Sequence, residues 1–453
     1  MLTYRGLYAL QHRGQESAGI CSFDGRRLMR YAATGLVTEV FKPGILEQLR
    51  GTHAIGHVRY STTGSCHDVN AQPLLIQYAR GQVAIAHNGN LVNAGLLREQ
   101  YEQEGAIFQT TSDTEVILHL LANPRHIDRD DPLAHVLTHL QGAYCLLLMF
   151  ADRIEACRDP FGLRPLVLGR LDNGALCAAS ETCALDMVDA QYLREVEPGE
   201  IATLSAAGLT SRTFVAPEQI CPAPCIFEQV YFADPSSDVF GQSVHQFRVD
   251  TGRRLAVEAP ADADLVIPVP NAARCAAMGF SQQSGLPLGR GFTTNHYAGR
   301  SFIMPTQDRR DLAVKMKLNV IRDSVRGKRL VVVEDSIVRG TTTRGKLGAL
   351  RRAGAMEIHV RVASPPIRNP CYFGIDFPDR KELIAVERSV EDIRRYLEVE
   401  SLAYLSLEGM LACARRDADA SCTACFSGRY PMPVDRPVHK FMLEKHQLPM
   451  FPT

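Results

Sequence analysis

The sequence lacks a net charge, a long apolar run, and any internal repeat or low-complexity segment. Fifty basic residues balance fifty acidic residues in a chain of 453, whereas a general binder of nucleic acid should be basic. No apolar stretch approaches the roughly 20 residues that a membrane-spanning helix needs. The N-terminal sequence MLTYRGLYALQHRG lacks the charged, apolar and small-residue order of a signal peptide. We therefore expect a cytoplasmic protein that binds neither nucleic acid nor membranes.

The composition is that of a folded globular protein, with 45% apolar and 22% charged residues. A chain of 453 residues usually forms two or more domains. Thirteen cysteines in a cytoplasmic chain do not indicate a disulfide framework. Most of them, such as Cys145 and Cys177, are expected to be small buried apolar residues. Only Cys422 and Cys425, in CTACF, have metal-ligand spacing, and alone they could form half of a zinc site.

The sequence pattern changes at the Pro-rich stretch APEQICPAP, residues 216–224, which predicts a domain boundary there. Before it, short β-like runs alternate with Gly-rich turns, which predicts stacked antiparallel sheets flanked by helices. One helix follows Ser112 and Asp113, either of which could cap it. After the boundary, ADLVIPVPN, KRLVVVEDS and EIHVRVAS alternate with helical segments, including one from Ala272 to Gly279. This pattern predicts a parallel sheet that is covered on both faces.

The run from Arg329 to Thr343 predicts a loop that holds a phosphorylated ribose. The apolar stretch 330–333 is typical of a central parallel strand, and Glu334 and Asp335 follow at its carboxyl end, where α/β sheets place ligands. Gly340 permits close backbone approach, and the threonines with the first N–H groups of the next helix form an anion cradle. A ribose diol can donate hydrogen bonds to the two carboxylates, and Mg²⁺ would screen them from the phosphates.

The segment EDSIVRGTT resembles the diphosphoribosyl-binding signature of type I phosphoribosyltransferases. The wider chain resembles the amidophosphoribosyltransferase family, in order, through LQHRGQESAGI, IGHVRYSTTG, AHNGNLVN, SDTEV, DPFGLRPL, SETCA, LREVEPGE, SPPIRNPCYFGID and CTACFSGRYP. The resemblance implies an N-terminal-nucleophile amidohydrolase (an αββα sandwich) at 1–220, a phosphoribosyltransferase domain with a parallel sheet at 221–410, and a tail with cluster cysteines at 411–453. The implied reaction forms 5-phosphoribosylamine, pyrophosphate and glutamate from phosphoribosyl diphosphate, glutamine and water, the first step of purine (IMP) biosynthesis.

The resemblance assigns glutamine-site roles to four residues of the first half. Asn88 and Gly89 would form the oxyanion hole, Arg59 would bind the glutamine carboxylate, and Asp113 would bind its α-ammonium group. Taken singly, Asn88–Gly89 is typical of a hairpin turn, Asp113 of a helix cap, and Arg59 of a surface charge.

The family's nucleophile is an N-terminal cysteine that has no counterpart in this sequence. The chain aligns with the family from just after the expected opening strand, and Cys21 lies downstream of HRGQ, where a core position is expected. A truncated start and a real loss both explain this. For the chain as it stands we expect no glutamine hydrolysis.

For the second half, the resemblance implies attack of ammonia on C1 of phosphoribosyl diphosphate, with ammonia arriving through an internal channel. Glu334 and Asp335 would face the ribose hydroxyls and Mg²⁺. The implied phosphate partners are Ser336, Arg339, Gly340, Thr341 and Thr342, together with Arg300, Lys315 and Lys317 on a closing loop. The sequence departs from the family at Asn271–Ala272, where Ala272 offers no ligand side chain at the metal turn, and at Thr294 and His296.

In the iron–sulfur subgroup of the family, four cysteines hold a [4Fe–4S] cluster. Their counterparts here are Cys225, Cys371, Cys422 and Cys425, which makes a cluster a better interpretation than zinc. The family further implies homotetramers or dimers and inhibition by purine nucleotides. Two alternatives stay open: a non-catalytic nucleotide-binding regulatory homologue, and a phosphoribosyltransferase that uses only free ammonia.

Overall fold

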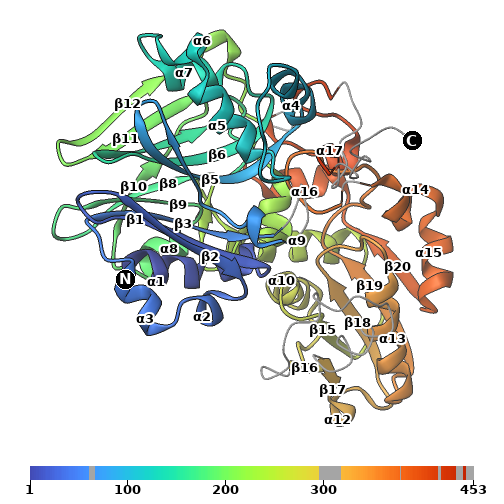
Figure 1. Ribbon diagram of the computed structural model, residues 1–453. Helices are drawn as coiled ribbons and strands as arrows, with labels where there is room; N and C mark the ends of the chain where they lie inside the picture. Colours follow the sequence, from blue (N-terminus) through green and yellow to red (C-terminus); the bar gives the residue numbers. More distant parts are fainter. Residues whose placement is uncertain (61–66, 295–317, 378, 417–419, 435–441, 445–453) are drawn as a thin grey trace, which may run out of the picture.

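The computed structural model describes residues 1–60, 67–294, 318–377, 379–416, 420–434 and 442–444 (Figure 1). The first half of the chain contains two large antiparallel sheets that stack on each other. One has six strands in the order β12-β11-β7-β6-β5-β4, and the other has three in the order β2-β1-β3. The strands are β1 (Ser17–Phe23), β2 (Leu28–Thr34), β3 (His53–Arg59), β4 (Leu74–Tyr78), β5 (Gly81–Leu91), β6 (Gly142–Met149), β7 (Arg153–Arg158), β11 (Glu200–Ser205) and β12 (Gly208–Thr213).

Helices cover both outer faces of this pair of sheets (Figure 1). The six-stranded sheet carries α4 (Ala94–Gln103), α5 (Thr114–Ala122), α6 (Pro124–Ile127) and α7 (Pro132–Leu137). The three-stranded sheet carries α1 (Leu2–Ala9), α2 (Val37–Val40), α3 (Pro43–Gln48) and α8 (Thr182–Asp186). A smaller sheet, β10-β8-β9, is built from β8 (Val167–Arg170), β9 (Leu176–Ala179) and β10 (Gln191–Glu195).

Three apolar clusters account for this layering. Ile85 and Leu146 of the large sheet pack with Ile117 of α5, while Ile20 packs with Leu7 of α1 on the opposite side. Between the sheets, Cys21 of β1 packs in a third cluster with residues of β5 and β6. Because each sheet buries apolar side chains on both faces, the layers are helix, sheet, sheet, helix. The predicted αββα sandwich is confirmed, and Cys21 is a core residue, as expected.

The second half is built on a parallel sheet in the order β15-β18-β19-β20. Its strands are β15 (Leu265–Pro268), β18 (Arg329–Glu334), β19 (Glu357–Val362) and β20 (Ser401–Tyr404). Alternate residues of β18 point to opposite faces: Val331 and Val333 pack toward α9 (Val244–Glu258) and α10 (Arg274–Ser284), while Leu330 and Val332 pack toward α13 (Thr341–Arg352) and α15 (Val390–Leu397). The predicted parallel sheet with two covered faces is confirmed.

Short elements complete this half. They are β13 (Asp238–Val239) paired with β14 (Gln242–Ser243), β16 (Phe292–Thr294) paired with β17 (Leu318–Val320), the helices α12 (Arg322–Val325), α14 (Ile384–Glu387), α16 (Leu407–Cys413) and α17 (Ala424–Ser427), and the π-helical turn η4 (Glu228–Phe232). No helix in the described ranges is both long and apolar enough to cross a membrane.

Two local predictions were wrong in part. The helix expected from Ala272 to Gly279 begins at Arg274 and continues to Ser284, because residues 271–274 form a turn in which the Arg274 amide donates to the Asn271 carbonyl at 3.2 Å. Asp113 precedes α5 but does not cap it with its side chain, and its carboxylate accepts instead from the Leu91 amide of β5, at 3.0 Å. The other predicted cap, Ser112, has a hydroxyl that accepts from the Thr114 amide at 3.3 Å.

Candidate functional site

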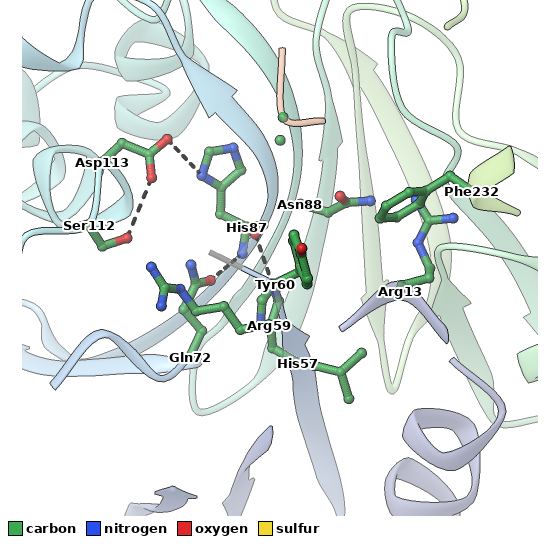
Figure 2. A pocket seen from close by; sticks show the side chains of 13 residues that line it. Arg13, His57, Arg59, Tyr60, Gln72, His87, Asn88, Ser112, Asp113 and Phe232 are labelled. Carbon is green, nitrogen blue, oxygen red and sulfur yellow. Dashed lines mark hydrogen bonds and ion pairs between the residues drawn. The ribbon is translucent and has the colours of Figure 1, made fainter. Parts of the chain in front are cut away.

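A cavity in the first half opens between the ends of β3 and β5 and the start of α5 (Figure 2). Two segments of the second half, at Phe232 and Gly374, complete its wall. The lining residues are Arg13, His57, Val58, Arg59, Tyr60, Gln72, His87, Asn88, Gly89, Ser112, Asp113, Phe232 and Gly374. The structure therefore brings together the four residues that the sequence assigned to a glutamine site.

All three single-residue alternatives for these positions were wrong. Arg59 is not a surface charge, since only 5% of it is exposed. Asn88 and Gly89 lie inside β5, where they pair with Cys145 and Tyr144 of β6, so they do not form a hairpin turn. Asp113 does not cap its helix. The local sequence preference of each residue favours those alternatives, but packing against the rest of the sheet overrides that preference.

One end of the cavity presents a carboxylate, which accepts hydrogen bonds, and the other presents an amide group that can donate one. At one end, Asp113 lies beside Ser112 and His87, with the His87 Nδ1 atom 3.5 Å from a carboxylate oxygen. Nearer Phe232, the Nδ2 atom of Asn88 is buried and has no hydrogen-bond partner among the described residues (Figure 2). A buried amide N–H without an acceptor is costly. A ligand oxygen placed there would satisfy it.

His57 positions the strand that carries Asn88. Its Nε2 atom lies 3.0 Å from the His87 carbonyl oxygen, and the His87 amide donates to Gln72 at 2.7 Å. Burial, together with the nearby positive charge of Arg59, lowers the pKa of His57 to about 3. His57 is therefore a neutral donor at physiological pH, which fixes β5 without adding a second positive charge beside Arg59.

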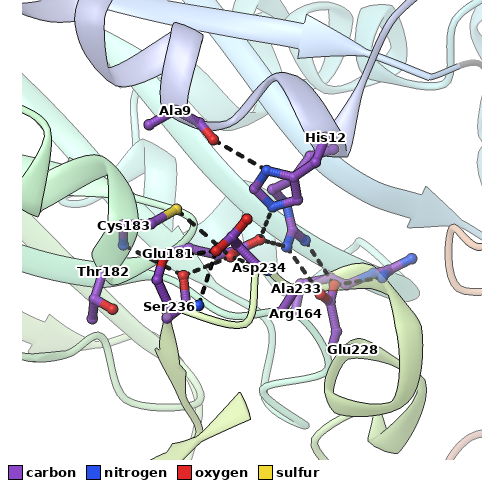
Figure 3. Close-up of polar contacts among 12 residues, drawn as sticks. Ala9, His12, Arg164, Glu181, Thr182, Cys183, Glu228, Ala233, Asp234 and Ser236 are labelled. Atoms are coloured by element: carbon purple, nitrogen blue, oxygen red, sulfur yellow. Dashed lines mark hydrogen bonds and ion pairs between the residues drawn. The ribbon is translucent and has the colours of Figure 1, made fainter. Parts of the chain in front are cut away.

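A buried ionic network joins the two halves beside this cavity (Figure 3). Glu228 of η4 accepts from both terminal nitrogens of Arg13, at 2.7 and 2.9 Å, and from Arg164 at 2.6 Å. Glu181 also accepts from Arg13, and it lies 2.8 Å from His12 Nε2. Arg13 and Arg164 are 6% and 1% exposed, and both glutamates are fully buried. Two guanidinium groups thus face two carboxylates in the interior.

The sequence reasoning missed this network. His12 and Arg13 stand in LQHRGQESAGI and Glu181 in SETCA, segments noted only for their resemblance. Their pairing partners lie 168 and 215 residues away. The available signal in the sequence was that these charged residues stand between apolar runs. Spacing along the sequence cannot identify a partner that lies so many residues away.

The loop from Asp335 to Gly340 connects β18 to α13, as predicted. Glu334 is 5% exposed; its Oε1 atom lies 3.2 Å from Lys346 Nζ, and its Oε2 atom has no hydrogen-bond partner among the described residues. Burial raises the pKa of Glu334 to about 7. Burial also raises the pKa of Asp335, while a 2.7 Å hydrogen bond donated by Ser336 opposes that shift.

The helix after this loop starts without a side-chain cap. Gly340 has a φ of 76°, and a Cβ atom there would lie 2.7 Å from Ile384 Cδ1, so glycine is required at this position. Thr341 and Thr342 are exposed at the first turn of α13, and Gly340, which precedes it, has no side chain to cap the N–H groups. These groups and hydroxyls form an open anion cradle. Arg339 points elsewhere, toward Glu382 at 2.5 Å.

The turn at residues 270–272 lies next to the two acids, because β15 pairs with β18 and the Val269 amide donates to the Val333 carbonyl at 2.8 Å. Ala272 is half-buried there and offers no ligand atom. Thr294 ends β16. The other loop residues named from the sequence, Arg300, Lys315, Lys317 and His296, lie outside the described residues.

The four cysteines assigned to a cluster line a single second cavity. Cys225 and Cys422 form a β-bridge, and the Cys425 carbonyl accepts from the amides of Arg368 and Asn369. The remaining wall is mostly aromatic and apolar, and it includes Arg164, which also bonds Glu228: Leu163, Arg164, Phe227, Phe373, Ile375, Phe377, Ala424 and Tyr430. Burial raises the pKa of Cys225 to about 11.

As the chain stands, these cysteines are not gathered around a metal position. Among the described residues, they do not form a group of three whose ligand atoms lie close together.

Comparison with known proteins gives consistent matches over nearly the whole chain. A family model described as a glutamine amidotransferase domain matches residues 57–187. The amidophosphoribosyltransferase of Synechocystis sp. is 47% identical over 450 residues, covering 98% of this chain and 90% of that protein. The one from Mycobacterium tuberculosis is also 47% identical, covering 96% of this chain and 84% of its own length.

Solved structures agree. The glutamine phosphoribosylpyrophosphate amidotransferase from B. subtilis, complexed with ADP and GMP, superposes with a TM-score of 0.90 at 44% identity, covering 98% of this chain and 97% of that one. A structure described as the allosteric regulatory enzyme of purine biosynthesis superposes with a TM-score of 0.92, also at 44% identity, and covers 98% and 96% of the two chains.

Proposed function

The chain belongs to the amidophosphoribosyltransferase family, and on that premise we propose that its second half transfers ammonia to phosphoribosyl diphosphate. The nitrogen lone pair attacks C1, the C1–O bond breaks, and its electron pair leaves with pyrophosphate. Loss of a proton from the nitrogen gives 5-phosphoribosylamine. The observation that carries the proposal is the buried, half-partnered Glu334 at the end of β18, directly before the uncapped start of α13.

Different residues of the loop bind different parts of the substrate. The amides at the start of α13, with Thr341, Thr342 and Gly340, bind the 5′-phosphate. Glu334 and Asp335 accept hydrogen bonds from the ribose hydroxyls, and Ser336 orients Asp335. Because the transition state is oxocarbenium-like, two carboxylates close to the ribose ring stabilise its positive charge. Arg339, held by Glu382 in the described structure, would have to leave that partner to reach a phosphate.

The family generally uses Mg²⁺ with this substrate, and the donors present fit such an ion. Glu334 and Asp335 supply carboxylate oxygens, and the Oε2 atom of Glu334 is available. The ion would make pyrophosphate a better leaving group. Since Ala272 contributes nothing at the neighbouring turn, we propose that water or substrate oxygens fill the rest of the coordination shell.

The transferase is tested with ammonium chloride as the nitrogen donor. With Mg²⁺ and phosphoribosyl diphosphate present, we expect pyrophosphate release that depends on ammonia. Glu334→Gln should lower this rate by about 10²-fold or more. Asp264→Asn, which changes an exposed acid at the opposite end of the sheet, should leave it nearly unchanged. Absence of ammonia-dependent turnover in the parent protein would instead favour the non-catalytic nucleotide-binding alternative, for which the altered turn at Ala272 is the specific support.

For the first half we propose a glutamine-binding site. Arg59 binds the α-carboxylate, Asp113 binds the α-ammonium, and Asn88 with Gly89 receives the amide oxygen as it gains negative charge. No cysteine lines this cavity among the described residues. The support is the orphaned Nδ2 atom of Asn88, which matches an oxyanion.

Calorimetric titration with glutamine separates binding from hydrolysis. We expect binding that is weakened at least tenfold in Asp113→Asn and unchanged in Asp131→Asn, an acid that caps α7 elsewhere in the same half. Unchanged glutamine affinity in Asp113→Asn would overturn the proposed site.

We propose that Cys225, Cys371, Cys422 and Cys425 hold a [4Fe–4S] cluster, in a structural role. Four thiols around one largely apolar cavity support this. Cys371→Ser should lose iron and sulfide together, whereas Cys177→Ser should retain both. A colourless protein containing zinc would overturn the proposal.

We further propose the division 1–220, 221–410 and 411–453, a homotetrameric or dimeric assembly, and feedback inhibition by purine nucleotides. The B. subtilis relative in complex with ADP and GMP supports the last of these. Inhibition of the ammonia-dependent rate by AMP or GMP, with the oligomeric state measured by light scattering, tests them.

A further inference from the structure

Three histidines gather on the outer helical layer of the first half, away from both cavities. His126 lies in α6, His135 in α7, and His139 just after α7, above the six-stranded sheet (Figure 1). One ring nitrogen of each lies within 4.8 Å of those of the other two. The ring centroids are 4.8 to 5.1 Å apart. The pair at positions 135 and 139 has the spacing H-x₃-H that is common in metal sites.

In two of the three rings, one nitrogen already makes a hydrogen bond to the protein, which is the usual arrangement in metal-binding histidines. Nδ1 of His139 lies 2.9 Å from the His135 carbonyl oxygen, which can only accept, so Nδ1 carries the hydrogen and Nε2 has the lone pair. Nε2 of His126 lies 3.3 Å from the Tyr101 hydroxyl. When that nitrogen donates to the hydroxyl, Nδ1 of His126 has the lone pair. Each ring thus keeps one nitrogen for a ligand.

A second observation points to a bound species. His126 is only 9% exposed, and its Nδ1 atom is buried without a hydrogen-bond partner among the described residues. Packing of the three rings against each other would explain their proximity but would leave this nitrogen orphaned. A cation between the rings satisfies it. Arg125, the arginine of α6, is paired with Glu104 at 2.9 Å.

We propose that His126, His135 and His139 bind a divalent transition-metal ion of the zinc class, with a water in the fourth position. Three neutral imidazoles suit zinc, copper or nickel, whereas magnesium prefers oxygen ligands. Zinc–nitrogen bonds of about 2.0–2.1 Å place ligand nitrogens roughly 3.3–3.4 Å apart in a tetrahedron. The rings therefore need to close by up to about 1.5 Å from the 4.8 Å limit, which side-chain rotation can supply. The ion clips α6 to α7.

The test is zinc binding by the full chain, with the coordination shell read by X-ray absorption. The cluster cysteines also bind metals, and the bond length separates the two sites: about 2.0–2.1 Å to nitrogen and about 2.3 Å to sulfur. We expect one equivalent of zinc bound to nitrogen. His135→Gln and His139→Gln, made separately, should each weaken it at least tenfold. His67→Gln, which changes an exposed histidine elsewhere, should have no effect.

Cobalt gives a second readout that needs no activity. Co²⁺ held by imidazole and water absorbs in the visible range without the thiolate charge-transfer bands that cysteine ligands add, and both histidine variants should lose this signal. Circular dichroism checks that each variant is folded. Arg125→Gln, which changes a residue of α6 that is not a proposed ligand, serves as a further control. Binding that survives in both histidine variants, a shell containing sulfur only, or no binding below millimolar zinc would each overturn the proposal.

Discussion

Replacing Glu228 by glutamine should destabilise the protein more than any exposed charge substitution. Glu228 accepts three hydrogen bonds from Arg13 and Arg164 and is fully buried. Glutamine keeps the volume but removes the charge, which leaves Arg13 with Glu181 alone and removes the carboxylate that Arg164 contacts. Breaking a buried ion pair by removing one partner costs about 3–5 kcal/mol. Neutralising Glu104, whose pairing with Arg125 is exposed, should cost less than about 1 kcal/mol.

Urea denaturation followed by far-UV circular dichroism measures this difference, since the chain has no tryptophan to report by fluorescence. With a slope of about 3 kcal/mol per M, the expected loss lowers the midpoint by roughly 1–1.7 M. The double variant Arg164→Met/Glu228→Leu leaves Arg13 and Glu181 as a balanced pair. It should therefore lose less stability than the sum of its two single changes. Equal midpoints for Glu228→Gln and Glu104→Gln would refute the reasoning.

Two further predictions concern acid stability and close packing. Burial alone would raise the pKa of Glu181, but Arg13 and His12 lower it to about 2. This carboxylate therefore stabilises the fold fully above pH 4.5 and loses that contribution, about 3 kcal/mol, as the pH falls toward 2; Glu181→Gln should flatten the acid limb of a stability–pH profile between those values. Gly89→Ala would place a Cβ atom 2.0 Å from the Ala143 carbonyl oxygen. It should cost about 1–3 kcal/mol in thermal unfolding, whereas Gly6→Ala, which meets nothing within 4 Å in α1, should be neutral or slightly stabilising.

The parts of the fold that the sequence predicted are those set by local pattern. The run at 330–333 is apolar, with three β-branched valines, so it forms a buried strand whichever neighbours it has, and the acids that follow must lie at the sheet's carboxyl edge. The helix start at Ala272 was wrong because a turn hydrogen bond delays the helix to Arg274. Such a bond depends on how the turn meets the adjacent strand, which one segment does not reveal.

The site was predictable only where residue order matched a known family. Asn88, Arg59 and Asp113 each favour an ordinary structural role when taken alone, and the cavity shows that tertiary packing assigns them otherwise. The residues paired with Glu228 lie in segments that match the family, but the match assigned them no role. The histidines at 126, 135 and 139 lie in no matching segment. Their partners come from separate segments, and burial of a charged side chain cannot be read from spacing.

One segment of the second half connects the two cavities of the protein. Cys371 lines the cysteine cavity, the Tyr372 carbonyl accepts from Asn90 of β5 at 2.9 Å, and a Cβ atom at Gly374 would lie 3.0 Å from the backbone of Gly89. Arg164 ties this segment to the ionic network, because it donates to both the Phe373 carbonyl and Glu228. Whatever fixes Cys371 therefore also fixes the backbone that closes over Asn88. A structural group held by the cysteines would act on the cavity at Asn88 through four residues of chain, without lining that cavity.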